Sequence, residues 1–318
     1  MPAYRALRAA LPDAQVTLIG LDSTKDLTCR FGRYLDEHLS FPGFPGIDEA
    51  PFQARDLPPF LSAIHADPFD LVIQMHGSGV TSNPFAVLLG GRVTAGFYLS
   101  GHYCPDPYYF LLYREGESEV LQLLRLMELL GFARQGDDLE FPLQEADYVE
   151  FLALTDRYSL RHGAYVCLHP GASRPDRRWP PAYFAAVGDR LVSLGFQVLL
   201  TGISAEMAIT AEVAARMTHE PIDLTGRTNL GALALLLRSA GLLITNDTGL
   251  SHLASAMRTP SIILFTTSDP GRWAPLDPTR HRALDERGMG QGIANITKKV
   301  TDEALLLLAL SETEATVV

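Results

Sequence analysis

Residues 244–257, ITNDTGLSHLASAM, join an apolar run to an apolar helical stretch through a small polar turn. Asp247 or Thr248 is the expected N-cap, which leaves the free N–H groups of Gly249 and its neighbours pointing outward. Helix N-termini bind anions through such donors and the helix dipole. His252 follows in the first turn, where a neutral imidazole could donate to a phosphate, or gain its proton when the anion arrives. A buried histidine bonded to a carbonyl is the alternative, but the coincidence of donors favours a phosphate-binding turn.

A second loop, HPGASRPDRRWPPAYF, follows the apolar run 164–169. Its arginines Arg174, Arg177 and Arg178 could each pair with phosphate oxygens in a bidentate way. The alternative is a capped loop with solvated arginines and Trp179 packed as an anchor. For the loop taken alone, this structural interpretation is the stronger one.

A third loop, TGISAEMAIT, follows the apolar run 196–201. Gly202 turns the chain, and Glu206 falls in the first turn of the next helix. Glu206 could accept hydrogen bonds from ribose hydroxyls. The helix dipole alone also favours an acid at this position, and taken alone this explanation is the stronger one.

Two further loops carry polar residues at the same kind of position. In LTGRTNLG the residues border a helix that Thr228 or Asn229 can cap, and the backbone there could border a base. In TTSDPGRWAPL, Asp-Pro-Gly predicts a turn. Arg272 and Trp273 could either line a pocket or clasp the domain.

The elements that position these loops alternate short apolar runs with amphipathic stretches, which predicts parallel sheets with helices on both faces. In the first half we expect helices at 3–11, 57–65, 83–89 and 117–131, and strands at 15–19, 70–75 and 92–97. In the second half we expect strands at 164–169, 196–201, 222–224, 241–245 and 261–265, and helices at 181–194, 204–218, 229–240, 249–257 and 301–312.

The pattern predicts an α/β protein with two doubly wound domains. Residues 37–59 and 99–116 read as ordered loops, and the polar stretch 140–163 as the region of the boundary. We therefore expect domains at 1–150 and 151–300. The apolar helix in 301–318 needs a large partner surface and could cross back to the first domain. Ligands in open α/β sheets bind beyond the carboxyl ends of the strands, which is where the loops described above lie.

Composition restricts the function. The 318 residues are 47% hydrophobic and 20% charged, typical of a soluble globular protein, and the formal net charge of -11 argues against a general nucleic-acid binder. No segment has the length and apolarity of a membrane span, and the first residues lack a signal-peptide core. Cys29, Cys104 and Cys167 show no metal-ligand spacing, and we expect reduced thiols in a cytoplasmic protein.

These loops, in this order, resemble the glycosyltransferase family that includes the ADP-heptose:lipopolysaccharide heptosyltransferases, glycosyltransferase family 9. The resembling segments are LHPGASRPDRRWPPAYFAAVGDRL, VLLTGISAE, LTGRTNLGALALLLRSAGLLITNDTGLSHLASAM and LFTTSDPGRWAPL. The first half matches more weakly, in PAYRALRAALPDAQVTLIG, FDLVIQMHG and GGRVTAGF. The resemblance implies a GT-B architecture, in which two Rossmann-like domains face a cleft. The C-terminal domain would hold the nucleotide-sugar donor, and the N-terminal domain the acceptor.

The resemblance also implies roles for individual residues. Arg177 stands where the family has a basic residue for the donor diphosphate. Gly202 falls in a donor-binding loop, and Glu206 in the same loop stands where the family has a ribose-binding acid. Asp247 matches the acid near the donor sugar. The phosphate-contacting turn is matched by Thr248, Gly249 and His252.

The implied activity is transfer of a sugar, heptose from ADP-heptose, with inversion onto a lipopolysaccharide core or related glycan. No metal and no cofactor is implied beyond the donor substrate. The acceptor would be reached at the inner face of the cytoplasmic membrane, with at most peripheral membrane contact.

The chain departs from the family at its start, where the family has a short strand and a Gly-Asp turn whose Asp is taken as the general base. The sequence begins within the helix that follows. Either the true start lies upstream, or the sheet is rearranged, or another residue is the base. His76 is the best substitute by position and pKa, His102 a weaker one, and Asp22 lies at the correct sheet edge. A loop histidine without a chemical role is the alternative for His76.

Two other functions stay open. One is a catalytically inactive nucleotide-sugar-binding remnant, which the missing Asp favours and the intact donor loops allow. The other is a nucleotide-sugar epimerase of similar two-domain shape, which would release a changed sugar without any acceptor.

Overall fold

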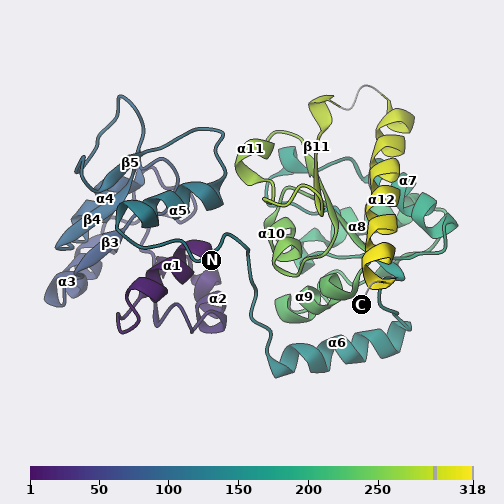
Figure 1. Ribbon diagram of the computed structural model, residues 1–318, viewed down its shortest axis with the longest axis horizontal. Coiled ribbons are helices and arrows are strands. Elements are labelled where there is room, and N and C mark those ends of the chain that lie inside the picture. Colours follow the sequence, from purple (N-terminus) through teal and green to yellow (C-terminus); the bar gives the residue numbers. More distant parts are fainter. Residues whose placement is uncertain (289–291, 317–318) are drawn as a thin grey trace. The chain divides into compact units, whose positions relative to one another are not determined.

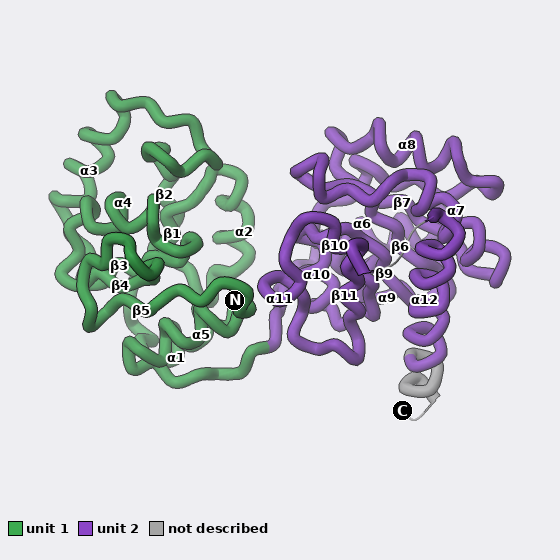
Figure 2. Tube along the Cα trace, turned by 90° about the horizontal axis from the view of Figure 1, so that it is seen from above, with its two compact units in different colours: residues 1–137 green, residues 138–318 purple. Residues whose placement is uncertain are grey.

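The computed structural model describes residues 1–288 and 292–316, with side chains up to Leu310. The chain forms two compact units, residues 1–137 and 138–318, coloured separately in Figure 2. The expected division at 150/151 would cut through helix α6 (Glu145–Tyr158), whereas the structure divides before this helix.

The N-terminal unit is an α/β layer structure with short parallel strands. Its helices are α1 (Pro2–Ala10), α2 (Lys25–Arg30), α3 (Leu57–Ala66), α4 (Ser82–Leu88) and α5 (Glu119–Leu129). Its strands are β1 (Thr17–Gly20), β2 (Glu37–Ser40), β3 (Leu71–Ile73), β4 (Val93–Tyr98) and β5 (Phe110–Leu112). β1 pairs with β2, and β3, β4 and β5 form a second sheet in that order.

The N-terminal unit has two hydrophobic cores, and each of its two sheets contributes residues to both of them. On one side, residues next to β1 and in β3 pack with α1 and α5, around Ala6 and Leu126. On the other side, Ile19 of β1 and Val72 of β3 pack with α3 and α4, around Phe85. The parallel α/β prediction for this unit is therefore confirmed, but its strands form two separate sheets.

The C-terminal unit contains one parallel sheet in the order β11-β10-β9-β6-β7-β8. The strands are β6 (Tyr165–His169), β7 (Gln197–Leu200), β8 (Ile222–Asp223), β9 (Leu242–Asn246), β10 (Ser261–Phe265) and β11 (His281–Asp285). The helices, besides α6, are α7 (Pro181–Ser193), α8 (Met207–Arg216), α9 (Leu230–Ser239), α10 (Gly249–Ala256), α11 (Pro270–Trp273) and α12 (Ile293–Thr316), and most are labelled in Figure 1.

The central strands of this sheet are mainly apolar and are buried along their whole length, because helices cover both faces. Every residue of β6, β9 and β10 is buried. One core joins these strands to α7 and α12, with Trp179 and Phe184 fully buried. The expected anchoring role of Trp179 is confirmed.

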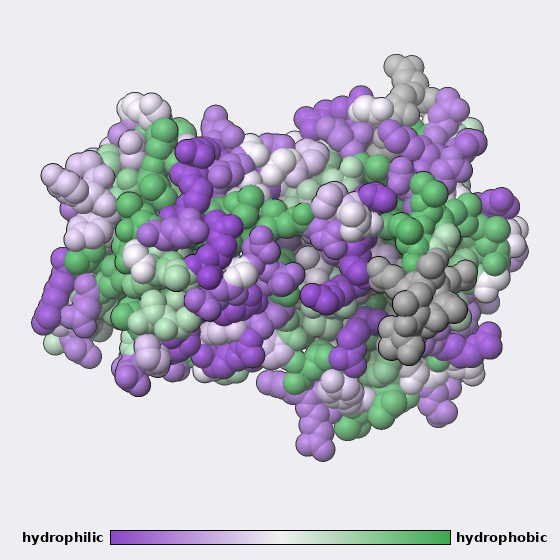
Figure 3. Space-filling view, viewed as in Figure 1, coloured by the Kyte–Doolittle hydropathy of each residue, from purple (hydrophilic) through white to green (hydrophobic). Residues whose placement is uncertain are grey.

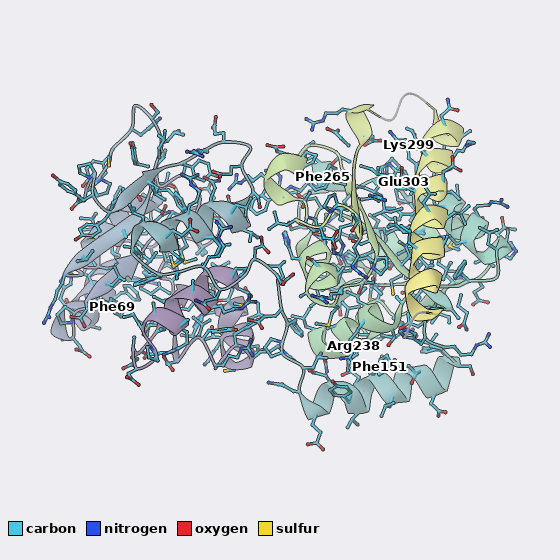
Figure 4. All side chains as sticks on the ribbon, in the orientation of Figure 1. Phe69, Phe151, Arg238, Phe265, Lys299 and Glu303 are labelled. Carbon is cyan, nitrogen blue, oxygen red and sulfur yellow. The ribbon has the colours of Figure 1, made fainter. Side chains whose placement is uncertain are left out.

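Helix α12 finds its partner surface within the C-terminal unit. It packs against α7 and β10, and Figure 1 shows it lying along the helices of this unit. Val300, Ala304 and Leu307 belong to the same core, and Glu303, labelled in Figure 4, lies 3.5 Å from Arg282 of β11. The helix therefore does not need the first domain as a partner, which corrects the expectation that it crosses back.

Helix α6 lies in the stretch 140–163, where the sequence predicted the domain boundary and no helix. Its first turn carries a capping box, in which Asp147 accepts from the backbone N–H of Gln144 at 2.8 Å. α6 packs against α9, and Figure 4 labels Phe151 and Arg238 on these two helices. A Cβ at Gly231 of α9 would come within 1.9 Å of the Asp147 carboxylate, so glycine permits this close approach.

The surface mixes polar and apolar side chains, as the face shown in Figure 3 illustrates. Over the described part of the chain, no helix combines the length and the apolar character that crossing a bilayer requires.

Candidate functional site

A cavity of about 310 Å³ lies at the carboxyl ends of β6, β7, β9 and β10, entirely within the C-terminal unit. Its position is the one expected for a ligand site in a parallel α/β sheet. The lining residues are His169, Ala172, Ser173, Arg177, Glu206, Asp247, Thr248, Gly249, His252 and Trp273. Four separate loops thus bring together seven of the residues that the sequence singled out.

The turn between β9 and α10 leaves the amino end of a helix open to this cavity. The Thr248 hydroxyl accepts a hydrogen bond from the Leu250 N–H at 3.3 Å, which makes Thr248 the N-cap. A Cβ built on Gly249 would meet no atom within 4 Å. Thr248 and Gly249 both line the cavity, so the amino end of α10 forms part of its wall, where an anion can bind.

Asn246 ties this turn to the loop after β6. Its side chain is fully buried and donates to the carbonyls of Pro170 at 2.9 Å and Gly171 at 3.2 Å. Its side-chain oxygen accepts from the Trp179 N–H at 2.9 Å. The amide thus satisfies three backbone groups of the loop that carries Arg177, and it fixes this loop against β9.

Arg177 is the arginine of the second loop that reaches the cavity. It lies 3.4 Å from the Asp247 carboxylate, and the exposed side-chain fractions are 28% for Arg177 and 5% for Asp247. The other two arginines of the loop do not line the cavity, because Arg174 forms a bidentate pair with Asp176 and Arg178 donates twice to the Ala172 carbonyl. Of the three arginines, Arg177 is therefore the one placed to meet a ligand in this cavity.

Glu206 ends a short 3-10 turn, Ser204–Glu206, after β7. Its carboxylate accepts from the Ile203 N–H at 2.9 Å. Glu206 therefore caps this turn and also lines the cavity. A Cβ on Gly171 would come within 2.1 Å of this carboxylate, and one on Gly202 within 3.2 Å. Gly202 thus backs Glu206 without lining the cavity itself.

His169 is a lining residue that the sequence analysis did not single out. It is the last residue of β6, and its Nε2 lies 3.9 Å from a carboxylate oxygen of Glu206, with both side chains about nine-tenths buried. Its Nδ1 lies 3.2 Å from the Thr201 hydroxyl. Burial lowers the pKa of His169, and the nearby Glu206 opposes this shift. A polar residue that ends the otherwise apolar run YVCL was the signal that could have found it.

His252 lines the cavity from the first turn of α10. Burial lowers its pKa, so the free imidazole is neutral near pH 7, while the carboxylate of Asp247 opposes the shift. The imidazole centroid lies 6.4 Å from the ring of Trp273. A neutral imidazole can donate one hydrogen bond to an anion, and a bound anion would raise its pKa.

The cavity therefore combines the amino end of a helix, a guanidinium and two imidazoles with the carboxylates of Glu206 and Asp247. The donors suit a phosphate or diphosphate, and the carboxylates suit the hydroxyl groups of sugars. Within the ranges that the structure describes, no group of three or more His, Cys, Asp or Glu side chains is arranged to hold a metal ion.

The base candidates lie in the N-terminal unit. His76 follows β3 and its Nε2 lies 3.2 Å from Glu49, and both side chains are about half exposed. The buried Gln74 donates to the His76 carbonyl, as does Ser82 at 2.9 Å, so the backbone of this loop is held firmly. Asp22 is exposed and accepts from the Ser40 hydroxyl, and His102 is also exposed.

Comparison with known proteins decides the family. A family model described as glycosyltransferase family 9 (heptosyltransferase) matches residues 60–291, well over half of the chain. The chain belongs to glycosyltransferase family 9. Lipopolysaccharide heptosyltransferase 2 of Salmonella typhimurium is 32% identical to this family 9 chain over 156 residues, which is 46% of the chain and 45% of that protein. The match to this curated relative thus spans less than half of its length.

Solved structures establish the fold. A family 9 glycosyl transferase from Veillonella parvula superposes with a TM-score of 0.75 at 22% identity, covering 97% of this chain and 92% of that one. ADP-heptose lps heptosyltransferase II of E. coli gives 0.68 at 22% identity, with coverages of 98% and 94%. The expected GT-B fold of two Rossmann-like units is confirmed. The assigned roles of the site residues stay predictions.

Proposed function

We propose that this family 9 protein is a glycosyltransferase that moves a sugar, heptose from ADP-heptose, with inversion onto a lipopolysaccharide core or related glycan. One observation carries the proposal: a single cavity unites Arg177, Glu206, His252 and the open end of α10. The family match and the heptosyltransferase relatives support the choice of the sugar and of the acceptor.

Each part of the donor has a suitable partner in this cavity. Glu206 would accept hydrogen bonds from the ribose hydroxyls. The N–H groups of Gly249 and its neighbours, with Thr248 and Arg177, would hold the diphosphate. Asp247, which lies beside Arg177, would accept from a hydroxyl of the sugar.

The chemical step breaks the bond between the sugar and the diphosphate, and negative charge develops on the leaving ADP. The N–H groups of α10, Arg177 and His252 are donors that stabilise this charge. We propose that these donors make a metal or other cofactor unnecessary. Binding of the diphosphate would raise the pKa of His252 and so strengthen its donation.

The acceptor hydroxyl must lose a proton as it attacks. We propose His76 as the base, with Glu49, 3.2 Å from its Nε2, orienting the ring. The acceptor would be reached at the inner face of the cytoplasmic membrane, by a protein in the cytoplasm with at most peripheral membrane contact.

The test measures the rate of sugar transfer from ADP-heptose to truncated lipopolysaccharide cores in the presence of EDTA. The wild type is compared with His252→Ala. Loss of one donor to the leaving group should lower the rate about 10²–10³-fold, equivalent to ~2.7–4 kcal/mol of barrier. His219→Ala is the matched control, because His219 is exposed and pairs with Asp189 outside the cavity.

The outcomes separate the proposed function from its rivals. An unchanged rate for His252→Ala in an active protein refutes the role of His252. Binding of ADP without any turnover supports the inactive remnant. Release of a changed sugar without an acceptor supports an epimerase.

A further inference from the structure

The order of strands in the sheet sets the order in which the four loops lie along the cavity. Glu206 follows β7, Arg177 follows β6, Gly249 follows β9 and Trp273 follows β10. In the sheet these strands are neighbours in the order β7-β6-β9-β10. Adjacent strands lie ~4.8 Å apart, so the loops of β7 and β10 are separated by three spacings, roughly 14 Å.

A nucleoside diphosphate sugar consists of a nucleoside, a diphosphate and a sugar in linear order. These three groups can therefore lie along the loops in the same order. With ribose at Glu206 and diphosphate at the amino end of α10, the group attached to the diphosphate continues toward the loop after β10. The wall of the cavity on that side is the indole of Trp273.

The position of this indole is fixed by its neighbours. The Arg272 guanidinium lies over the ring, 4.5 Å from its centroid, and the imidazole of His252 lies at 6.4 Å. Asp269 caps the short helix α11 by accepting from the Gly271 N–H at 2.9 Å. Thr266 donates to the Asp176 carbonyl at 2.8 Å, which ties this loop to the one that carries Arg177.

We propose that Trp273 is a specificity-determining residue that packs against the transferred sugar of the donor. Pyranose rings present apolar C–H faces, which pack well on large aromatic surfaces. Trp273 thus contributes to the affinity for a nucleotide sugar and not to that for the bare nucleotide. The inference rests on the proposed donor, because it takes its direction from the diphosphate at α10.

Intrinsic fluorescence tests this placement in the wild-type protein. The chain has two tryptophans, and the other one, Trp179, is completely buried. Trp273 lines the cavity and Trp179 does not, so we expect Trp273 to account for most of the change in emission that a ligand in the cavity causes. ADP-heptose should alter the emission at saturation more than ADP does, and Trp273→Phe should remove the difference.

Calorimetric titrations of Trp273→Ala and Trp273→Phe give the second readout. We expect Trp273→Ala to weaken binding of ADP-heptose at least tenfold while the Kd for ADP changes less than twofold. Trp273→Phe should recover most of the affinity for ADP-heptose. Tyr108→Ala is the control, because it removes an exposed aromatic side chain from the N-terminal unit.

Equal losses of affinity for ADP and for ADP-heptose, or no loss for either, would overturn the role of Trp273. Wild-type protein that binds neither ligand would instead overturn the proposed function, so the two failures are distinguishable.

Discussion

Two glycines, Gly171 and Gly202, leave room for the carboxylate of Glu206. A Cβ on Gly171 would come within 2.1 Å of this group, whereas the backbone of Gly171 is not in the left-handed region. The backbone conformation at position 171 therefore permits alanine, but the Cβ of alanine would clash with the side chain of Glu206. The Glu206 side chain is flexible and can rotate away, so the conflict falls on the ligand site and not on the fold.

We predict that Gly171→Ala weakens ADP binding at least tenfold and changes the free energy of unfolding by less than about 1 kcal/mol. Calorimetric titration with ADP and urea unfolding measure the two quantities. Gly288→Ala is the matched control, because its Cβ would meet no atom within 4 Å. Unchanged ADP affinity in Gly171→Ala would contradict the ribose-binding role of Glu206.

At the scale of elements, the site depends on the attachment of the loop after β6 to the end of β9. Asn246 makes this attachment by donating to two carbonyls and accepting from one N–H. These three hydrogen bonds explain why an asparagine stands at the end of β9. Its amide, with both donors and an acceptor, matches the three backbone groups that it meets.

Asn246→Asp keeps the shape of the side chain but removes the donors and places a carboxylate beside two carbonyls. We predict a loss of at least ~1–3 kcal/mol in the free energy of unfolding, since buried polar groups lose their partners. ADP affinity should also fall at least tenfold because Arg177 is no longer held.

Asn229→Asp is the comparison variant for this prediction, because Asn229 caps α9 outside the cavity and Asp is an equally good N-cap. Its contact with Glu150 makes some loss of stability expected, but ADP affinity should stay at the wild-type value. Equal ADP affinities for Asn246→Asp and the wild type would show that the attachment does not position the site.

The sequence predicted the elements with strong periodicity and missed those that depend on tertiary partners. β6, β7, β9 and β10 are apolar runs, and all four were found. β2 reads EHLS, which has no apolar face, and it is a strand because β1 pairs with it. α6 was missed because its apolar residues do not form one face: Val149 and Leu152 are exposed, and the helix is stabilised by a capping box and by packing on α9.

The site was predictable to the extent that its residues follow strands of a parallel sheet. That rule brought Glu206, Arg177 and the turn of α10 to one edge. It could not distinguish Arg177 from Arg174 and Arg178, since the partners of these two arginines are set by the fold of the loop. It also passed over His169, which lies inside a strand, because the rule examines the residues that follow strands.

At the scale of the whole molecule, stability should depend on pH through a buried histidine that does not line the cavity. His281 of β11 is buried, and its Nδ1 lies 2.7 Å from the Ser261 hydroxyl. Burial lowers the pKa of His281 to about 4, against the opposing effect of Asp277. In the unfolded chain the pKa returns to about 6.5. Between these values the unfolded state binds the proton and the native state does not, so acidification favours unfolding.

We predict that the free energy of unfolding falls by about 3 kcal/mol more between pH 7 and pH 4 in the wild type than in His281→Gln. Both tryptophans belong to the C-terminal unit, so urea unfolding followed by tryptophan fluorescence reports on the relevant unit. The aspartates with lowered pKa values change the free energy of unfolding mainly at a more acidic pH, below their ordinary pKa of 3.8. Identical pH profiles for the two proteins would contradict this assignment.

The central claim concerns the C-terminal unit, in which backbone donors of α10 and Arg177 are proposed to bind a diphosphate. Calorimetric titration of the full chain with ADP, in the presence of EDTA, tests it most directly. The account predicts saturable binding at one site with a Kd below about 1 mM, weakened at least tenfold by Arg177→Gln. A folded chain that gives no saturable heat with millimolar ADP, or an Arg177→Gln variant that binds as the wild type does, would contradict it.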